Sequence, residues 1–186
     1  QENLLLCHQC GHMFLDIEPV PYYKNVMRSV SVSSEMITYR RSQFNSLSSL
    51  FSKPLSDVKV LEIGAGNGQY SSLLSEFFPL CFATEKNFSN CVDHSVNYID
   101  THPDDSDFSD VMKSYGLFDL VFCFSYLEHL PNPLRVLQEI ELLLAPGGYA
   151  VLEVPNSDFI RNNGLLCEII PDHIHYFTAR SFASVS

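Results

Sequence analysis

A short glycine-rich segment, Gly64-Ala65-Gly66-Asn67-Gly68, has the residue types of a ligand-binding turn. It follows a β-branched run that ends at Glu62-Ile63, and a helical pattern begins directly after it. Glycine lets the backbone turn tightly and lets a ligand approach without interference from a Cβ atom. Because ligands of open parallel sheets bind beyond the carboxyl ends of the strands, the turn is a candidate binding site. A strand-to-helix loop can also be rich in glycine for geometry alone.

An acidic residue follows at the spacing of a ribose site. Glu85 comes 21 positions after Gly64, at the end of the next strand that the sequence predicts. A carboxylate there can accept hydrogen bonds from both hydroxyls of a ribose. The alternative is a solvated acid in a polar loop beside Lys86. Together the turn and Glu85 predict an adenosine-containing ligand.

The glycine spacing discriminates between adenosine cofactors. A dinucleotide site favours Gly-x-Gly-x-x-Gly, which directs the start of a helix at a pyrophosphate. The spacing in this chain is Gly-x-Gly-x-Gly. S-adenosylmethionine (SAM) carries no phosphate, and its ammonium group needs an acid such as Glu62 near the turn. The pattern therefore predicts SAM, and an NAD-linked oxidoreductase is the weaker alternative.

Short apolar runs alternate with amphipathic stretches from Val58 onward, which is typical of a doubly wound α/β domain. Strands are predicted over 58–63, 80–84, 96–99, 118–124 and 149–154, and an apolar stripe predicts a helix over 70–78. A second helix is expected to begin with Asn132 as N-cap and Pro133 at its first position, and to stop at 145–148. We expect a Rossmann-like, mostly parallel sheet in three α/β/α layers.

Three zones divide the chain. Residues 1–23 hold a Cys-x-x-Cys-Gly turn, residues 24–56 form a Ser- and Arg-rich helical lead-in, and residues 57–186 form the predicted SAM-binding domain. The chain starts at Gln1 and stops at Ser186 within a plausible helix, so we expect a fragment that is incomplete at its C-terminus.

The motifs between Val58 and Thr178 resemble those of the class I SAM-dependent methyltransferases. VLEIGAGNG is similar to their first motif and Glu85 to their ribose-binding acid, while FDLVFCFSYLEHLPNP and LLLAPGGYAVLEVPN resemble their fourth and fifth strand regions. The resemblance implies an enzyme that transfers a methyl group from SAM to a small-molecule acceptor. It also implies two further antiparallel strands after the fifth. The roughly 30 residues beyond Asn156 have the pattern of loop and helix, so we expect these strands to be missing.

The resemblance assigns residues to the cofactor. Gly64 to Gly66 are expected to contact the methionine portion, Asp100 and Thr101 to border the adenine, and Ser125 to Leu127 to close over the reacting methyl group. The full set implied is Glu62, Gly64, Ala65, Gly66, Asn67, Gly68, Glu85, Lys86, Asp100, Thr101, Ser125, Tyr126 and Leu127. Rival alignments for the adenine position are Asp104, Asp105, Asp107 and Asp110.

Two further segments resemble parts of this family. Cys7-His8-Gln9-Cys10-Gly11-His12 is similar to the second half of a zinc ribbon that precedes some bacterial members, including sugar C-methyltransferases. A structural zinc needs four ligands, so zinc at Cys7 and Cys10 requires an upstream partner that this chain lacks. The segment 171–178 resembles a His-x-His-x-Phe-Thr/Ser stretch that covers the active-site mouth. It can equally be a loop with Thr178 as the N-cap of a helix.

Methyl transfer is an in-line displacement at a methyl group that the sulfonium already activates. The protein must align the acceptor and exclude water, and it needs a base only when the acceptor carries a proton. Candidate bases are His129, His173 and His175, because imidazole titrates near neutral pH. Glu128 is expected to be a structural partner. A catalytically inactive SAM-binding module, acting as a partner or regulator, is the second hypothesis.

Composition argues against two classes of partner, nucleic acids and membranes. The net charge is −11, from 11 basic and 22 acidic residues, which disfavours nucleic acid. No apolar run approaches the roughly 20 residues of a membrane span, and no secretory signal pattern opens the chain. The six cysteines are spread without a disulfide pattern, so we expect a cytoplasmic protein with no membrane partner. The sequence gives no indication of an oligomeric state.

Overall fold

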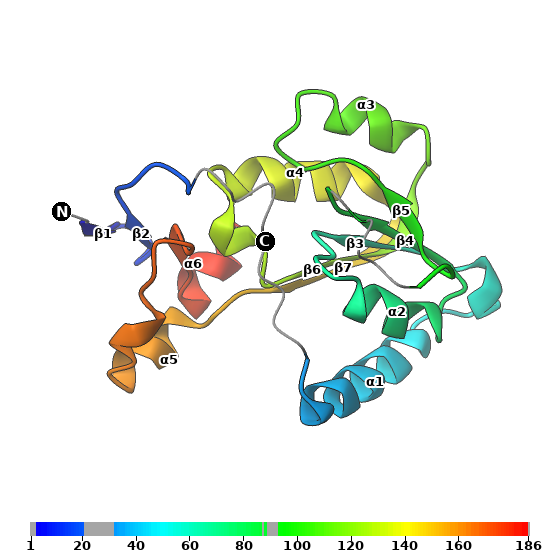
Figure 1. Cartoon of the computed structure of the whole chain (residues 1–186), viewed down its shortest axis with the longest axis horizontal. Coiled ribbons are helices and arrows are strands. Elements are labelled where there is room, and N and C mark those ends of the chain that lie inside the picture. The colour runs from blue at the N-terminus through cyan, green and yellow to red at the C-terminus, as the bar shows by residue number, and fades with distance from the viewer. Residues whose placement is uncertain (1–2, 21–31, 87, 89–92, 186) are drawn as a thin grey trace.

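The computed structural model describes residues 3–20, 32–86, 88 and 93–185. Its centre is a parallel sheet of five strands in the order β5-β4-β3-β6-β7 (Figure 1). The strands are β3 (Lys59–Ile63), β4 (Leu80–Thr84), β5 (Asn97–Ile99), β6 (Phe118–Phe124) and β7 (Leu144–Glu153). The predicted Rossmann-like, doubly wound sheet is therefore confirmed.

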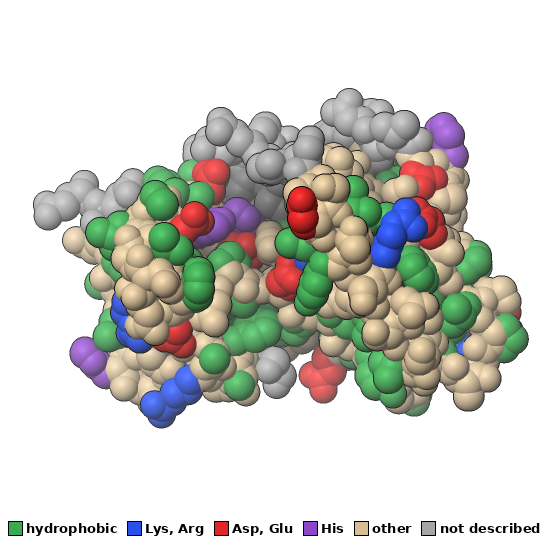
Figure 2. All heavy atoms as spheres, turned by 90° about the horizontal axis from the view of Figure 1, so that it is seen from below, with side chains coloured by type: hydrophobic (Ala, Val, Ile, Leu, Met, Phe, Trp, Pro, Cys, Tyr) green, Lys and Arg blue, Asp and Glu red, His purple; other side chains and the backbone are tan. Residues whose placement is uncertain are grey.

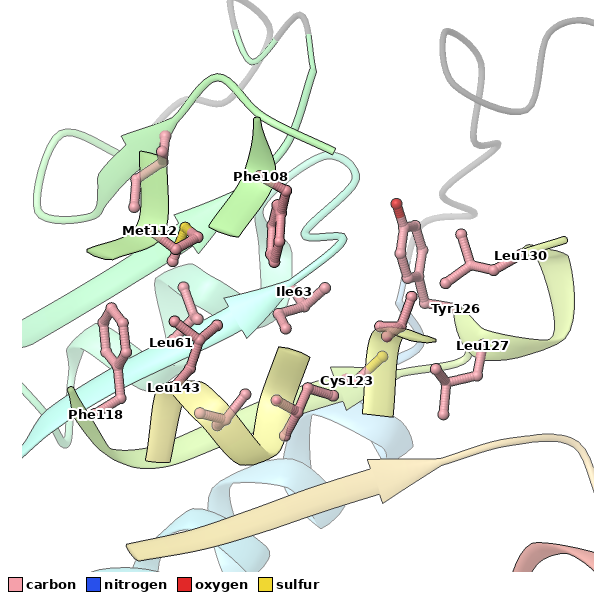
Figure 3. Packing of buried hydrophobic residues seen from close by; sticks show 14 of the residues in the cluster. Leu61, Ile63, Phe108, Met112, Phe118, Cys123, Tyr126, Leu127, Leu130 and Leu143 are labelled. Atoms are coloured by element: carbon pink, nitrogen blue, oxygen red, sulfur yellow. The ribbon is translucent and has the colours of Figure 1, made fainter. Parts of the chain in front are cut away.

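Helices cover both faces of this sheet and make the expected three layers. Helices α1 (Ser34–Ser48) and α2 (Gln69–Ser75) lie on one face, and α3 (Phe108–Lys113) and α4 (Pro133–Leu143) on the other (Figure 1). Alternate residues of each strand point to opposite faces. Accordingly Leu61 packs with α3 and α4 (Figure 3), whereas Val60 packs in the cluster that contains Phe44 of α1.

The ends of the helices follow local sequence signals in part. Asn132 caps α4 as predicted, and its side-chain oxygen accepts a hydrogen bond from the Arg135 amide at 3.1 Å. The helix predicted over 70–78 ends earlier, at Ser75, although Phe78 is still fully buried. Helix α4 ends at Leu143, before 145–148 as predicted, but the strand predicted over 149–154 begins earlier, at Leu144, which pairs with Phe118. That pairing is a tertiary contact, and no local signal reports it.

A second, smaller sheet joins the two ends of the described chain. It is antiparallel, in the order β1-β2-β8, and consists of β1 (Leu4–Leu6), β2 (Met13–Leu15) and β8 (His175–Tyr176). The first and last of the three predicted zones therefore share one sheet. Of the described residues after Glu153, none pairs with the central sheet.

Short elements complete the structure. Helix α5 (Ser157–Asn162) and helix α6 (Ala179–Ala183) flank β8, and three 3₁₀ turns are η1 (Leu55–Asp57), η3 (Leu127–His129) and η4 (Leu166–Glu168). Thr178 caps α6 as the sequence predicts, in a reciprocal capping box with Ser181. No helix in the described part of the chain has both the length and the apolarity to cross a membrane.

Candidate cofactor site

The glycine turn lies at the carboxyl end of β3, between β4 and β6, where the order of the strands along the sheet changes direction. Gly64, Gly66 and Gly68 have φ angles of 74°, 58° and 76°, in the left-handed region that favours glycine. The amides of Gly64 and Ala65 both donate to the Thr84 carbonyl at 3.1 Å, which ties the turn to β4. The turn therefore sits at the topological switch point of the sheet, the usual ligand position in this architecture.

Gly64 is required for a second reason. A Cβ atom added there would lie 2.4 Å from the ring of Tyr126, which is only 2% exposed. Tyr126 stands just beyond the end of β6, beside Leu127 and Leu130 (Figure 3). The turn after β3 and the loop after β6 are thus packed directly against one another.

Glu85 is brought to the turn as the spacing predicts. Its carboxylate accepts a hydrogen bond from the Gly66 amide at 2.8 Å, and its own amide donates to the Ile99 carbonyl at 3.2 Å. Burial raises the pKa of Glu85 to about 6, against the lowering effect of the Gly66 and Lys86 amides. At neutral pH the turn therefore carries a charged, partly desolvated acceptor.

Glu62 lies beneath the turn, between the sheet and α2. It is 2% exposed, and its carboxylate accepts a hydrogen bond from the Ser71 hydroxyl of α2. Burial raises the pKa of Glu62 to about 8, while Ser71 and the charge of Arg40 lower it. A buried acid of this kind favours its protonated form at neutral pH until a cation approaches.

Three further predicted residues lie in the loops after β4 and β5: Lys86 follows β4, and Asp100 and Thr101 follow β5. Lys86 is engaged in ion pairs, at 2.9 Å from Asp105 and 3.9 Å from Asp100, and the Asp100 side chain is 65% exposed. Thr101 is buried, and its hydroxyl has no hydrogen-bond partner among the described residues. A buried hydroxyl without a partner is costly, so this atom fits a position where a ligand supplies one.

The loop after β6 is held in an uncommon backbone conformation. Ser125 has a φ of 45° and is exposed, while its amide donates to the Glu153 carbonyl at 2.9 Å. Non-glycine residues seldom adopt positive φ, and such positions concentrate at functional sites. Tyr126 and Leu127 follow it into the core, and the Tyr126 ring lies 5.8 Å from that of His102.

Arg40 of α1 belongs to the same region, although the sequence did not single it out. It is completely buried, forms an ion pair with Glu153 at the end of β7, and lies over the rings of Phe124 (4.1 Å) and Tyr70 (4.7 Å). In the sequence, its burial is indicated by its position four residues before Phe44, which places both side chains on the same face of the lead-in helix. Arg40 fixes α1 against the carboxyl edge of the sheet.

The three candidate bases lie in two groups. The His129 and His173 rings are 4.8 Å apart, and His175 Nδ1 lies 3.0 Å from His12 Nε2. Burial lowers the pKa of His129, and burial with the neighbouring imidazole lowers the pKa values of His173 and His175 to about 4. All three are therefore unprotonated near pH 7 and are weaker bases than a free imidazole.

Cys7 and Cys10 occupy a tight turn between β1 and β2. The Cys7 amide donates to the His12 carbonyl at 2.8 Å, and the Gly11 amide donates to the Cys7 carbonyl at 2.9 Å. Backbone amides of Cys10 and Gln9 lower the pKa of the Cys7 thiol. Within the described residues these thiols are not part of any group of three metal-type ligands, so zinc at this turn stays a prediction.

Comparison with known proteins identifies the family of this chain. A family model described as "Methyltransferase domain" matches residues 36–185. The chain belongs to this family. The prediction of a class I SAM-dependent methyltransferase is thereby confirmed at the level of the family, whereas the zinc-ribbon sugar C-methyltransferase subgroup stays a prediction.

Curated relatives match between about half and two thirds of this chain. The "Ubiquinone biosynthesis O-methyltransferase" of Haemophilus ducreyi is 29% identical over 109 residues, which cover 53% of this chain and 45% of that protein. The protein of the same name from Colwellia psychrerythraea is 26% identical over 136 residues, which cover 64% and 53%. The chain thus spans about half the length of the curated relatives it matches.

Solved structures share the fold of the methyltransferase domain. The plantazolicin methyltransferase BpumL in complex with S-adenosylhomocysteine (SAH) superposes with a TM-score of 0.61 at 20% identity. The match covers 80% of this chain and 61% of that one. The YcgJ protein of Bacillus subtilis gives a TM-score of 0.58 at 15% identity, covering 77% and 65%. At these identities the likeness concerns the arrangement of strands and helices.

Proposed function

We propose that this chain binds SAM at the carboxyl ends of β3 and β4 and transfers its methyl group to a small-molecule acceptor. One observation carries the proposal. The Glu85 carboxylate lies 2.8 Å from the Gly66 amide, so the ribose-type acid and the Gly-x-Gly-x-Gly turn form a single site. SAM contributes a methyl group bound to a positive sulfonium, and the protein has to hold and align it.

The described residues suit the parts of SAM. The methionine portion lies against the backbone turn of Gly64 to Gly66, whose glycines have positive φ angles, and Glu85 accepts hydrogen bonds from the ribose. Glu62 lies directly under the turn, where the approach of an ammonium group favours its ionised form. Asn67 and Gly68 complete the turn, and Gly68 begins α2.

The loops beside the glycine turn contact the adenine and the methyl group of SAM. Thr101 offers a buried hydroxyl without a partner among the described residues, and Asp100 beside it is exposed to the same edge of the sheet. Lys86 orients this edge through its ion pair with Asp105. Ser125, Tyr126 and Leu127 bound the opposite side, where Tyr126 packs on Gly64.

The acceptor side is a hollow between the part of the molecule that carries α5 and α6 and the part that carries α1 and α2 (Figure 2). Acidic and histidine side chains lie along it in that view. We infer that His129, His173 or His175 takes the proton of the acceptor, since each is unprotonated near pH 7, and the lowered pKa values make each a weaker base than a free imidazole. The curated relatives are named for O-methylation, which favours a hydroxyl acceptor over an amine or a carbon. The net charge of −11 argues against nucleic acid as the acceptor.

Calorimetry with SAM, S-adenosylhomocysteine and NAD tests the donor assignment. We expect binding of the first two and none of NAD. We expect Glu85→Gln to weaken SAM binding, whereas Glu76→Gln, at the exposed residue that follows α2 and pairs with Arg41, leaves it unchanged. Binding of NAD in place of SAM would sink the proposal. Labelled-methyl transfer to a panel of hydroxylated metabolites then separates an enzyme from a SAM-binding module that transfers nothing.

A further inference from the structure

Three metal-type side chains from two distant segments converge beside η3. Glu128 and His129 belong to η3, and His173 comes just before β8. One ligand atom of each lies within 4.8 Å of the others. The Ile174 amide donates to the Glu128 carbonyl at 2.8 Å, so backbone pairing sets the distance between the two segments. The cluster is therefore a feature of the fold as well as of side-chain rotamers.

The hydrogen bond of His129 determines which of its nitrogens is free. His129 Nδ1 lies 2.6 Å from the Asp172 carbonyl oxygen. A carbonyl oxygen only accepts, so Nδ1 carries the proton and Nε2 presents its lone pair. His129 Nε2 faces Glu128, at 3.9 Å from Oε1. An imidazole fixed by a backbone carbonyl through one nitrogen, with the other aimed at a carboxylate, is the usual preparation of a metal-binding histidine.

Glu128 lacks the partners that a buried carboxylate needs. Its side chain is 1% exposed, and its Oε2 has no hydrogen-bond partner in the part of the chain that the structure describes. Its one ion-pair neighbour among those residues is His129. A buried carboxyl group without compensation takes up a proton, and a bound cation would compensate its charge instead.

We propose that Glu128, His129 and His173 form a binding site for a divalent transition-metal ion of the zinc type. Two imidazoles and one carboxylate are a known donor set for zinc with an open coordination position. Zinc ligands at about 2.0–2.2 Å from the metal lie roughly 3.5 Å apart, so the cluster would close by about 1 Å on binding. Magnesium is the poorer candidate, because it prefers an octahedral set of oxygen ligands.

The inference does not depend on SAM binding, and it can be tested without any turnover. A metal held by His129 and His173 would leave His175 as the candidate base. The full chain is freed of metal with a chelator and titrated with Co²⁺, whose visible bands report the ligands. We expect bands without a thiolate-to-metal charge-transfer feature, and displacement of Co²⁺ by Zn²⁺. Charge-transfer bands alone would place the metal at Cys7 and Cys10 and overturn the assignment.

Variants locate the site. Glu128→Gln and His173→Asn are each expected to weaken Zn²⁺ binding at least tenfold, since even an outer partner of a metal ligand changes affinity by about 10–100-fold. The matched control His94→Gln changes an exposed imidazole outside the cluster and is expected to have no effect. Unchanged Zn²⁺ affinity in His173→Asn would overturn the proposal. That variant also decides the question if Glu128→Gln fails to fold, because His173 is only half-buried.

Discussion

Two parts of the site are assembled in different ways: the glycine side, formed by the turn at Gly64 and by Glu85, and the histidine side, formed by His12, His129, His173 and His175. On the glycine side, Gly64 and Glu85 follow two neighbouring strands whose last residues, Ile63 and Thr84, are paired in register. On the histidine side, His12 and His175 meet across 163 positions of sequence, through the pairing of β2 with β8. The first arrangement needs only the parallel sheet, whereas the second needs the two ends of the described chain to meet.

The two sides also differ in what they offer a ligand. The glycine side presents backbone amides and one carboxylate, groups whose positions the sheet fixes. The histidine side presents imidazoles whose basicity burial has changed, with pKa values of about 4 for His173 and His175. Burial thus shifts pKa values on both sides, upward for the acids Glu62 and Glu85 and downward for the histidines.

The largest effect is expected for Gly64→Ala. The added Cβ would lie 2.4 Å from the Tyr126 ring at a φ of 74°, so overpacking and backbone strain act together. We expect a loss of about 3 kcal/mol in the free energy of unfolding, measured with denaturant. Gly147→Ala is the matched control, since Gly147 has a φ of 77° and nothing within 4 Å, and strain alone should cost about 1–2 kcal/mol. Equal losses for the two variants would show that the Tyr126 contact does not matter.

The next effect concerns Glu85. Because hydrogen bonds to a charged group contribute about 1.5–3 kcal/mol, Glu85→Gln should weaken SAM binding about 10- to 100-fold. In the unchanged protein SAM affinity should fall as the pH drops through about 6, where Glu85 takes up a proton. Calorimetry across this range should show a flatter profile in Glu85→Gln. The same pH dependence in both proteins would assign the titration to another group.

Glu62 should appear in the pH dependence of stability. Its pKa rises from 4.5 in the unfolded chain to about 8 in the fold, so its stabilising contribution is complete below 4.5 and is lost as the pH rises through 8. Between these values the free energy of unfolding should fall by up to about 1.4 kcal/mol per pH unit from this one group. Denaturant unfolding of Glu62→Gln should lack this component. Parallel curves for the two proteins would contradict the raised pKa.

The smallest effect tests the histidine side. His12→Phe keeps an aromatic ring but removes the 3.0 Å hydrogen bond to His175, which should cost about 1 kcal/mol. Hydrogen exchange of the Leu15 amide, which donates to the Ile174 carbonyl, should become about fivefold faster. His8→Phe, at an exposed position in the same segment, is the control. If both variants exchange alike, the His12–His175 contact does not hold β2 to β8.

Residue patterns alone determined the parallel sheet and its ligand turn. The run over 118–124 became β6 with those bounds, and Asn132 and Pro133 began α4, because these signals depend on neighbours along the chain. Glu85 could be placed beside the turn because consecutive parallel strands end at the same edge of a sheet.

Only the tertiary structure decided the rest. The extension of β7 back to Leu144 follows from its pairing with Phe118, and the burial of Arg40 follows from the docking of α1 on Glu153. Glu128, expected to be a structural partner, proved to face His129 and His173 without a hydrogen bond to its Oε2 among the described residues. Such contacts join residues far apart in sequence, and burial, pKa and ligand geometry arise only where those segments meet.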